Sequence, residues 1–177
     1  MEWVSNIMNK ALFLDRDGVI NIEKDYLYKI DDFEFFDGIF ELCRYYQSKN
    51  YKIIVVTNQS GIARGYYSEL DFDVLSQWMI QQFSINAIEL TDIFHCPHHP
   101  DISGECSCRK PKPGMLLDAQ QIHNLDLANS IMIGDKERDI EAGLNAGLKE
   151  TYLFDNKKII LKSKATKIVN KLDDIWK

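Results

Sequence analysis

The chain has little of what marks secreted, fibrous or membrane-spanning proteins. Its 177 residues include four cysteines, four prolines and nine glycines. No apolar run approaches the roughly 18 residues that a membrane-spanning helix needs. The formal net charge of -6 argues against a protein that coats nucleic acid, although it permits a local basic pocket for one phosphate. We therefore expect neither a nucleic-acid partner nor a membrane partner.

Length and composition favour one ordinary globular domain. Hydrophobic residues make up 45% of the chain and charged residues 27%, and a chain of this size can bury a core without disulfides. The first residues, MEWVSN, carry an early acid and lead into no signal-like apolar core. We predict a monomer located in the cytoplasm, a compartment in which thiols stay reduced. Residues 1–177 would form one domain, with a core at about 10–155 and a C-terminal tail at 156–177.

Short apolar segments alternate with helical patterns. Residues 38–50 place Ile39, Leu42, Cys43 and Tyr46 on one helical face, so Cys43 is expected in the core. Alternation of this kind predicts an α/β fold, a Rossmann-like parallel sheet with helices on both faces. The tail is predicted to form a short closing helix. The expected strands are 10–15, 51–57, 91–96, 130–135 and 150–154, and the other expected helices are 69–84, 114–123 and 140–146.

Acidic side chains end two of the expected strands. Asp15 and Asp135 stand at strand ends, and Asp17 follows Asp15 by two residues in the run DRDGVIN. Ligands of parallel sheets bind at the carboxyl ends of the strands. There, one carboxylate can attack a phosphoryl group while a second protonates the leaving oxygen and later activates water. Because these acids repel a phosphate dianion, the arrangement requires a cation, and Mg²⁺ suits oxygen ligands.

Donors for phosphoryl oxygens follow the second expected strand. Residues 57–61, TNQSG, give a hydroxyl, an amide and backbone N–H groups at a turn, and Lys110 or Lys112 can add a positive charge. In isolation this stretch is also typical of a polar turn, as DRD is of a capping acid. Their common position at strand ends favours the chemical interpretation. Asp139 is expected behind the site, because an acid at the start of a helix also complements the helix dipole.

Residues 95–108 hold three of the four cysteines and three of the four histidines. The pattern Cys96-x-His98 and Cys106-x-Cys108 supplies four ligands of the kind that tetrahedral zinc prefers. A full set of four protein ligands predicts a structural zinc and disfavours a disulfide. Spacing alone does not decide between His98 and His99 as the histidine ligand.

Four motifs together carry a family resemblance. DRDGVIN, TNQSGIARG, CPHHP with CSCRKPKPGM, and IGDKERD occur in this order between Leu12 and Phe154, with the tail outside. They resemble the haloacid-dehalogenase superfamily of aspartate-nucleophile phosphatases, and more narrowly its D-glycero-D-manno-heptose 1,7-bisphosphate 7-phosphatases. The resemblance implies a Mg²⁺-dependent phosphoric monoester hydrolase that removes the 7-phosphate through an aspartyl-phosphate intermediate, in the biosynthesis of nucleotide-activated heptose for lipopolysaccharide or another surface glycan.

The resemblance also implies a role for single positions. It makes Asp15 the nucleophile and Asp17 the general acid/base, and it places Mg²⁺ on Asp15, the backbone carbonyl of Asp17, and Asp135. Thr57 and Lys110 would stabilise the phosphoryl group, because Lys112 falls where the family fixes no residue. The implied ligands of the zinc loop, residues 96–108, are Cys96, His98, Cys106 and Cys108. The implied substrate-binding positions are Glu23, Lys24, Asp25, Tyr26, Asn58, Gln59, Ser60, Arg109 and Lys136.

Two features concern the shape of the pocket. Relatives usually have glycine where this chain has Asp25, which affects contacts to the sugar rather than the chemistry. Many members of the superfamily insert a cap domain, but residues 16–56 and 58–109 leave no room for one. We therefore expect a capless fold with an open pocket, in which a zinc-bound loop directs Arg109 and Lys110 toward the phosphate.

Three other functions compete with this interpretation. A histidinol-phosphate phosphatase shares the acids and a cysteine-histidine loop, although TNQSGIARG and KPKPGM resemble the heptose enzymes more closely. A receiver-like signalling domain also carries a phosphorylated aspartate at a strand end, but Asp17 and the cysteine loop fit it poorly. A zinc-stabilised binding module without catalysis is the third. The anomer of the heptose bisphosphate does not follow from the sequence.

Overall fold

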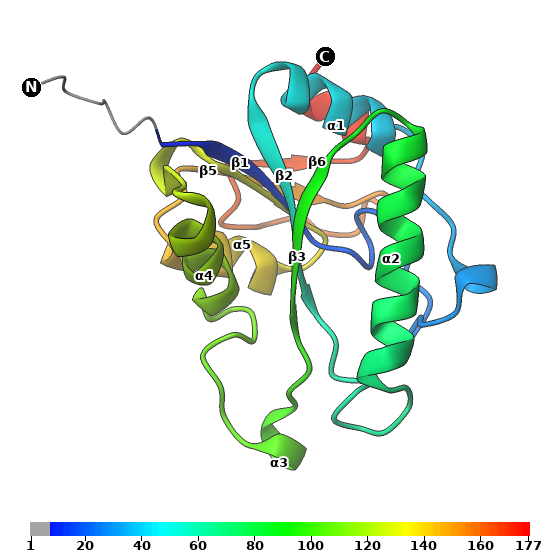
Figure 1. Cartoon of the computed structure of the whole chain (residues 1–177). Helices are drawn as coiled ribbons and strands as arrows, with labels where there is room; N and C mark the ends of the chain where they lie inside the picture. Colours follow the sequence, from blue (N-terminus) through cyan, green and yellow to red (C-terminus); the bar gives the residue numbers. More distant parts are fainter. Residues whose placement is uncertain (1–7) are drawn as a thin grey trace, which may run out of the picture.

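A computed structural model describes residues 8–177. The residues MEWVSN, for which a signal peptide was considered above, lie outside the described residues. The chain forms a six-stranded sheet in the order β3-β2-β1-β4-β5-β6 (Figure 1). Every pair of neighbouring strands is parallel. The strands are β1 Lys10–Leu14, β2 Tyr51–Asn58, β3 Leu90–Cys96, β4 Ile131–Gly134, β5 Glu150–Phe154 and β6 Lys167–Val169.

Helices cover both faces of the sheet, as the sequence predicts. Successive strand residues point to opposite faces, so Leu12 and Leu14 of β1 join one core cluster while Ala11 and Phe13 join the other. The first cluster includes residues of α1 and α2, among them Cys43, and the second includes residues of α4 and α5. The helices are α1 Ile39–Ser48, α2 Glu69–Ile85, α3 Pro100–Ser103, α4 Gly114–His123 and α5 Glu137–Asn145, with 3-10 turns η1 Ile30–Asp32, η2 Leu127–Asn129 and η3 Leu172–Ile175.

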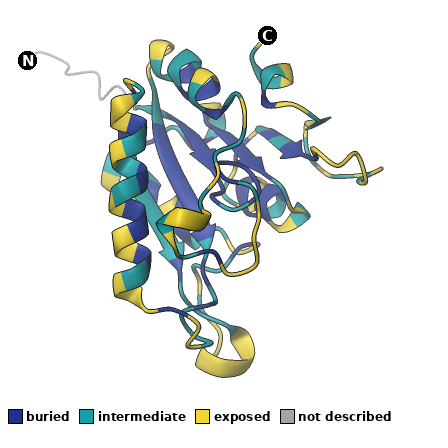
Figure 2. Ribbon diagram, turned by 90° about the vertical axis from the view of Figure 1, so that its right-hand side faces the viewer, coloured by how far each residue is buried: buried dark blue, intermediate teal, exposed yellow. Residues whose placement is uncertain are grey.

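The burial pattern follows from this layering. In Figure 2 the central strands are mostly dark blue, while the outward sides of the helices are yellow. All residues of β4 are buried, and so are the last four of β1. A strand buried on both faces reads as a continuous apolar run, which explains the sequences KALFL and IMIG.

Strand order reverses between β1 and β4. From β1 the chain runs outward through β2 and β3, and it then returns to pair β4 with the other side of β1. The segments that follow β1 and β4 therefore leave the sheet beside each other, at the kind of crevice where open α/β folds bind ligands. The loop after β2 and the segment carrying α3 lie at the same edge (Figure 1).

No inserted domain covers this edge within residues 8–177. Between β1 and β2 the chain forms η1 and α1, and between β2 and β3 it forms α2. The capless architecture predicted from the intervals is thus the one observed.

Side-chain caps set where two helices begin. Ser68 and Asp71 form a reciprocal capping box at the start of α2, with distances of 3.1 Å and 2.8 Å. At α5, the carboxylate of Asp139 accepts the backbone N–H of Lys136 at 3.0 Å, so the helix begins at Glu137 rather than at the predicted Ile140. This earlier start places the side chains of residues 137–139 on an ordered helical turn.

The tail was predicted as a closing helix, and this prediction was wrong. Residues 167–169 instead add β6 to the sheet edge beside β5, and η3 follows and contacts α1. Val169 and Leu172 are buried in the same core cluster as α1 and α2. The alternating basic and apolar residues that suggested a helix also fit a short edge strand that buries one side.

We expect Leu172→Ala to lower the free energy of unfolding by about 2–5 kcal/mol, because Leu172 is 1% exposed and its truncation leaves a cavity. Leu161→Ala is the matched control in the same tail, and since Leu161 is 95% exposed the change should stay within about 0.5 kcal/mol. Urea denaturation followed by circular dichroism measures both. Equal effects of the two substitutions would show that the tail does not contribute to the core.

Candidate active site

Asp15 lies at the carboxyl end of β1, beside β4 and almost fully buried. Its backbone N–H donates to the carbonyl of Ile133 at 3.0 Å, and its carboxylate accepts the backbone N–H of Arg16 at 2.7 Å. Burial raises the pKa of Asp15 well above its ordinary value; Asp139 adds to this and Lys110 opposes it. A carboxylate in this setting carries poorly solvated charge that a phosphoryl group or a cation can approach.

Lys110 reaches Asp15 from the segment before α4. Its ammonium lies 3.0 Å from Oδ1 of Asp15 and 2.8 Å from Oδ1 of Asp139, and it donates to the carbonyl of Val56 at 2.8 Å. The residue is 1% exposed. Burial works against the charged ammonium, but Asp139 and Asp15 outweigh it and raise the pKa of Lys110. Lys112 is different, since it pairs with Glu105 at the surface.

Asp17 lies in the turn after β1 and lines a neighbouring pocket. Its carboxylate accepts hydrogen bonds from Arg16, from Gln59 at 2.9 Å and from Asn21 at 3.1 Å. Arg16 is itself buried and also donates to the carbonyl of Leu27 at 2.8 Å. These donors fix the orientation of Asp17 toward the adjacent pocket.

Three carboxylates converge where β1 and β4 end. Asp15, Asp135 and Asp139 offer oxygen atoms that lie within 4.8 Å of one another. Burial raises the pKa of Asp135, and Lys136 opposes it from 2.7 Å. Gly18 has φ +87°, and a Cβ there would lie 2.3 Å from Oδ2 of Asp135, so a side chain would displace this carboxylate. An all-oxygen donor set with excess negative charge fits a hard cation such as Mg²⁺.

The last residues of β2 and the turn that follows contribute polar groups at the predicted positions. The hydroxyl of Thr57 accepts a hydrogen bond from Gln59 at 2.8 Å. The side chain of Asn58 pairs with the backbone of Lys110 in both directions, at 3.0 Å and 3.1 Å. Gln59, which was predicted to bind the substrate, is largely buried and donates to both Thr57 and Asp17. These hydrogen bonds of Gln59 connect the ends of β1 and β2, and no pattern in the sequence predicts them.

A polar pocket of about 250 Å³ opens next to Asp17. Residues predicted from the sequence form much of its lining, and they come from the segments after β1 and β2 and from the loop before α4. Four further side chains were not predicted, although Arg64 belongs to the quoted motif TNQSGIARG and Arg138 to IGDKERD. The predicted lining residues are Asp17, Glu23, Asp25, Tyr26, Asn58, Gln59, Ser60 and Arg109, and the additional ones are Arg64, Tyr67, His99 and Arg138.

Two lysines predicted to bind the substrate, Lys24 and Lys136, do not line this pocket. The ammonium of Lys24 donates to the carbonyl of Asp32 at 2.7 Å and lies 3.6 Å from Glu34. Lys136 lies next to Asp135 and 3.8 Å from Glu23, on the side of the carboxylate cluster. Burial raises the pKa of Glu23, and nearby Asp17 adds to it.

The substitution of Asp25 for the usual glycine causes no backbone strain. The left-handed residue of this loop is Tyr26, with φ 57°, whereas Asp25 is not in that region. The ring of Tyr26 packs edge-on against Tyr66, with centroids 4.7 Å apart, and Tyr26 also lines the pocket.

The cysteine loop brings its four predicted ligands together. The sulfur of Cys96 lies 3.0 Å from that of Cys108 and 3.6 Å from that of Cys106. Nδ1 of His98 lies 3.3 Å from the Cys108 sulfur. All the cysteines are free. The sulfurs of Cys96 and Cys106 are near the separation of about 3.7 Å that tetrahedral zinc–sulfur geometry requires, whereas those of Cys96 and Cys108 lie closer together. The cluster could hold a soft metal ion.

The structure distinguishes the two histidines that spacing left open. His99 accepts a hydrogen bond from Arg64 through Nε2 at 2.7 Å, and its Nδ1 lies 3.3 Å from the backbone nitrogen of Asp101 in α3. His98 is therefore the histidine that faces the thiols. The loop also touches the pocket directly, because the Arg109 guanidinium donates to the carbonyl of His98 at 3.1 Å.

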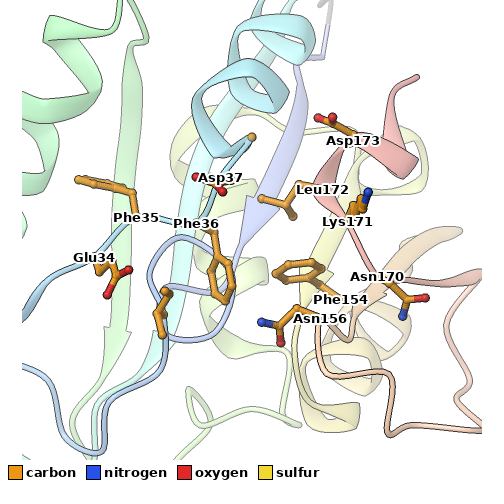
Figure 3. A pocket seen from close by; sticks show the side chains of 12 residues that line it. Glu34, Phe35, Phe36, Asp37, Phe154, Asn156, Asn170, Lys171, Leu172 and Asp173 are labelled. Atoms are coloured by element: carbon orange, nitrogen blue, oxygen red, sulfur yellow. The ribbon is translucent and has the colours of Figure 1, made fainter.

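A larger pocket of about 530 Å³ lies away from these groups, between residues 34–38 and the tail. Figure 3 shows Phe36 and Phe154 next to each other in its lining, with Leu172 nearby. The two rings meet edge-on with centroids 5.0 Å apart. Neither Asp15 nor Asp17 nor Asp135 lines this pocket, so it is not the candidate active site.

None of the described helices is both long enough and apolar enough to cross a lipid bilayer.

Comparisons with known proteins agree with this geometry. A sequence family described as HAD-hydrolase-like matches residues 107–174. The D-glycero-alpha-D-manno-heptose-1,7-bisphosphate 7-phosphatase of Campylobacter jejuni is 56% identical over 149 residues, 84% of each chain. The D-glycero-beta-D-manno-heptose-1,7-bisphosphate 7-phosphatase of Helicobacter pylori is 50% identical over 147 residues, 82% of this chain and 84% of that one.

A solved structure shows the same arrangement of elements. The D,D-heptose 1,7-bisphosphate phosphatase of B. bronchiseptica, complexed with magnesium and phosphate, matches with a TM-score of 0.82 and 29% identity, covering 94% of this chain and 95% of that one. The fold and the acids at its switch point define a haloacid-dehalogenase-like phosphatase. With 56% identity to a relative that it covers to 84%, the chain belongs to the D-glycero-D-manno-heptose-1,7-bisphosphate 7-phosphatases.

We expect Lys110→Met to lower the free energy of unfolding by about 3–5 kcal/mol, because it leaves Asp15 and Asp139 buried without their cation. Lys112→Met is the matched control, since it removes an exposed ion pair from the same KPK segment and should leave stability unchanged. Urea denaturation of the two variants measures the difference. A Lys110→Met protein as stable as the wild type would contradict the role given to the buried ion pairs.

Proposed function

We propose that this protein removes the 7-phosphate from D-glycero-D-manno-heptose 1,7-bisphosphate through an aspartyl-phosphate intermediate. The observation that carries the proposal is the pair of carboxylates after β1. Asp15 is buried against Lys110 at the strand switch, while Asp17 is held by Arg16 and Gln59 beside an open polar pocket. One acid is thus placed to attack and the other to exchange protons with a leaving group.

The chemistry would proceed in two displacements. An oxygen of Asp15 attacks phosphorus, the bond from phosphorus to the sugar oxygen breaks, and Asp17 gives that oxygen a proton. In the second displacement, Asp17 takes a proton from a water molecule whose oxygen attacks the aspartyl-phosphate. Inorganic phosphate leaves and Asp15 is restored. The hydroxyl of Thr57 and the ammonium of Lys110 stabilise the charge on the phosphoryl oxygens.

Mg²⁺ would be held by Asp15, Asp135 and the backbone carbonyl of Asp17. The converging carboxylates after β1 and β4 support this assignment. When bound, the ion neutralises charge on the carboxylates and on the phosphate. Lys136, next to Asp135, and Glu23 would complete the polar wall on that side.

The cysteine loop would hold a structural zinc through Cys96, His98, Cys106 and Cys108. Four protein ligands leave no open position for water, so such a zinc fixes the loop and does not enter the reaction. Arg109 and Lys110 follow the last ligand directly, and the loop would therefore determine their placement. Because metal-binding thiols must stay reduced, we also propose that the protein acts in the cytoplasm.

Asp15→Asn should lower phosphate release by a factor on the order of 10⁴ or more, because the nucleophile is lost. Asp17→Asn should lower it by about 10²–10⁴, the range of general acid–base catalysis. Asp73→Asn, an equal change of charge on the exposed side of α2, should leave the rate unchanged. Phosphate release is measured with Mg²⁺ and both anomers of heptose 1,7-bisphosphate, with histidinol phosphate as the competing substrate.

Three outcomes would replace the proposal by one of its competitors. Faster turnover of histidinol phosphate than of either heptose anomer would favour the histidinol-phosphate phosphatase. Stoichiometric phosphorylation of Asp15 without turnover would indicate a signalling domain. A wild type that releases no more phosphate than Asp15→Asn on any of these substrates, with both proteins folded and neither above background, would leave only a binding module.

Elemental analysis of the purified protein should find about one zinc per chain. Cys108→Ser should lower the zinc content sharply and reduce kcat/KM, since the loop that carries Arg109 and Lys110 loses its anchor. Cys43→Ala is the control, because Cys43 lies on the buried face of α1 and its substitution should leave the zinc content unchanged. If Cys108→Ser retained both zinc and rate, the link between loop and catalysis would be wrong.

A further inference from the structure

Tyr67 lies in the wall of the pocket beside Asp17 and is almost fully buried, with 6% of its surface exposed. Its ring stacks on that of Tyr28, with centroids 5.3 Å apart and an interplanar angle of 15°. A Cβ on Gly61 would lie 2.2 Å from the same ring, so only glycine lets the backbone after β2 approach it this closely. The ring of Tyr67 is thus fixed from two sides.

The hydroxyl of Tyr67 is directed at the side-chain amide of Gln59. It donates to Oε1 at 2.5 Å, and burial raises the pKa of Tyr67 to about 12, so the hydroxyl keeps its proton. Nη2 of Arg16 donates to the same oxygen at 3.3 Å. Because both donors face Oε1, the two N–H groups of the amide remain for other partners.

The amide of Gln59 donates to two residues of the site. Its Nε2 donates to Oγ1 of Thr57 at 2.8 Å and to Oδ2 of Asp17 at 2.9 Å. If the amide were turned over, its oxygen would instead face Asp17, and an ionised carboxylate has no proton to donate. The hydroxyl of Tyr67 therefore stabilises the orientation of Gln59 in which the amide holds Asp17.

Thr57 and Asp17 do not depend on this amide equally. Thr57 belongs to β2, is 1% exposed and has a β-branched side chain with few rotamers. Asp17 lies in the turn after β1, and its side chain is 20% exposed. Its donors Arg16 and Asn21 come from the same segment, so Gln59 is the donor that ties the carboxylate to β2. A loosened amide should thus disturb Asp17 first.

We propose that Tyr67 is a positioning residue for catalysis, which acts through Gln59 to hold the general acid/base Asp17 in place. This inference rests on the proposed function, because it concerns the proton transfers assigned to Asp17. The relay runs from the hydroxyl of Tyr67 to the amide of Gln59 and from the amide to the carboxylate of Asp17. A small displacement of a reacting group lowers the rate even when every reacting atom is present.

The leaving group shows whether Asp17 is affected. The ratio kcat/KM reports the first displacement, which needs a proton for a sugar alkoxide but not for p-nitrophenolate, a group that leaves readily without one. A defect in Asp17 therefore lowers kcat/KM for a sugar phosphate and spares p-nitrophenyl phosphate. A defect in the fold, or in the contact of Thr57 with the phosphoryl group, lowers both alike.

Tyr67→Phe should lower kcat/KM for D-glycero-D-manno-heptose 1,7-bisphosphate about tenfold, the loss expected for one hydrogen bond, and that for p-nitrophenyl phosphate by less than about twofold. The variant keeps the stacked ring, and circular dichroism checks its fold. Tyr66→Phe is the matched control. It removes a hydroxyl from the neighbouring residue, which is 53% exposed, and should change neither substrate.

A second variant tests the route through the amide. Gln59→Leu should show the same selectivity between the two substrates as Tyr67→Phe. Adding Tyr67→Phe to Gln59→Leu should lower kcat/KM by less than about twofold more, because both changes break one relay. A direct contact of Tyr67 with the sugar would instead cost as much in the Gln59→Leu background as in the wild type, and that result would overturn the inference.

Three further results would also overturn it. Equal losses on both substrates would assign Tyr67 to the phosphoryl group or to the fold. A Tyr67→Phe protein that does not fold would assign the hydroxyl to stability. A Tyr67→Phe protein with unchanged kcat/KM on both substrates would leave the hydroxyl without a part in catalysis.

Asp17→Asn separates this inference from the proposed function. It should also lose far more kcat/KM on the sugar phosphate than on p-nitrophenyl phosphate. Equal losses for Asp17→Asn would reject its role as general acid and, with it, both the proposed mechanism and the positioning role. Selective loss for Asp17→Asn without selective loss for Tyr67→Phe would reject the positioning role alone. If the wild type hydrolyses histidinol phosphate instead of the heptose bisphosphate, that alcohol phosphate replaces it in every comparison.

Discussion

The buried ammonium of Lys110 is the contact on which the rest of the site depends. It joins the end of β1 through Asp15, the start of α5 through Asp139 and the end of β2 through the carbonyl of Val56. Charges removed from water are tolerated only when they are closely paired. The strand switch is therefore held by one cation that also lies against the proposed nucleophile, so the stability of the fold and the chemistry of the site share one group.

The cysteine loop is attached to this centre at several points. The backbone of Lys110 pairs with Asn58, Arg109 donates to His98, and His99 accepts from Arg64. The loop thus contacts both the segment after β2 and the wall of the pocket. This explains why Arg109 and Lys110 directly follow the Cys and His cluster in the sequence.

The sequence predicted the sheet, its helices and the meeting of the acids at its edge, because alternation and strand-end chemistry are local patterns. The three cysteines that the sequence analysis grouped also lie together in the structure. The strand in the tail was not predicted, because a three-residue edge strand is too short to show an alternation of apolar and polar residues. The choice of His98 over His99, and the convergence of Arg64 with Arg138, depend on contacts between segments distant in the chain, which no local pattern records.

The described chain carries no domain that could close over the carboxyl edge of the sheet. Enzymes with lids exclude water by a hinge motion that often limits turnover. Here the sugar would itself have to shield the aspartyl-phosphate, and the product could leave without any opening step. Its residence time would then be set by the strength of its contacts alone, so tight binding of the leaving group would directly slow the catalytic cycle.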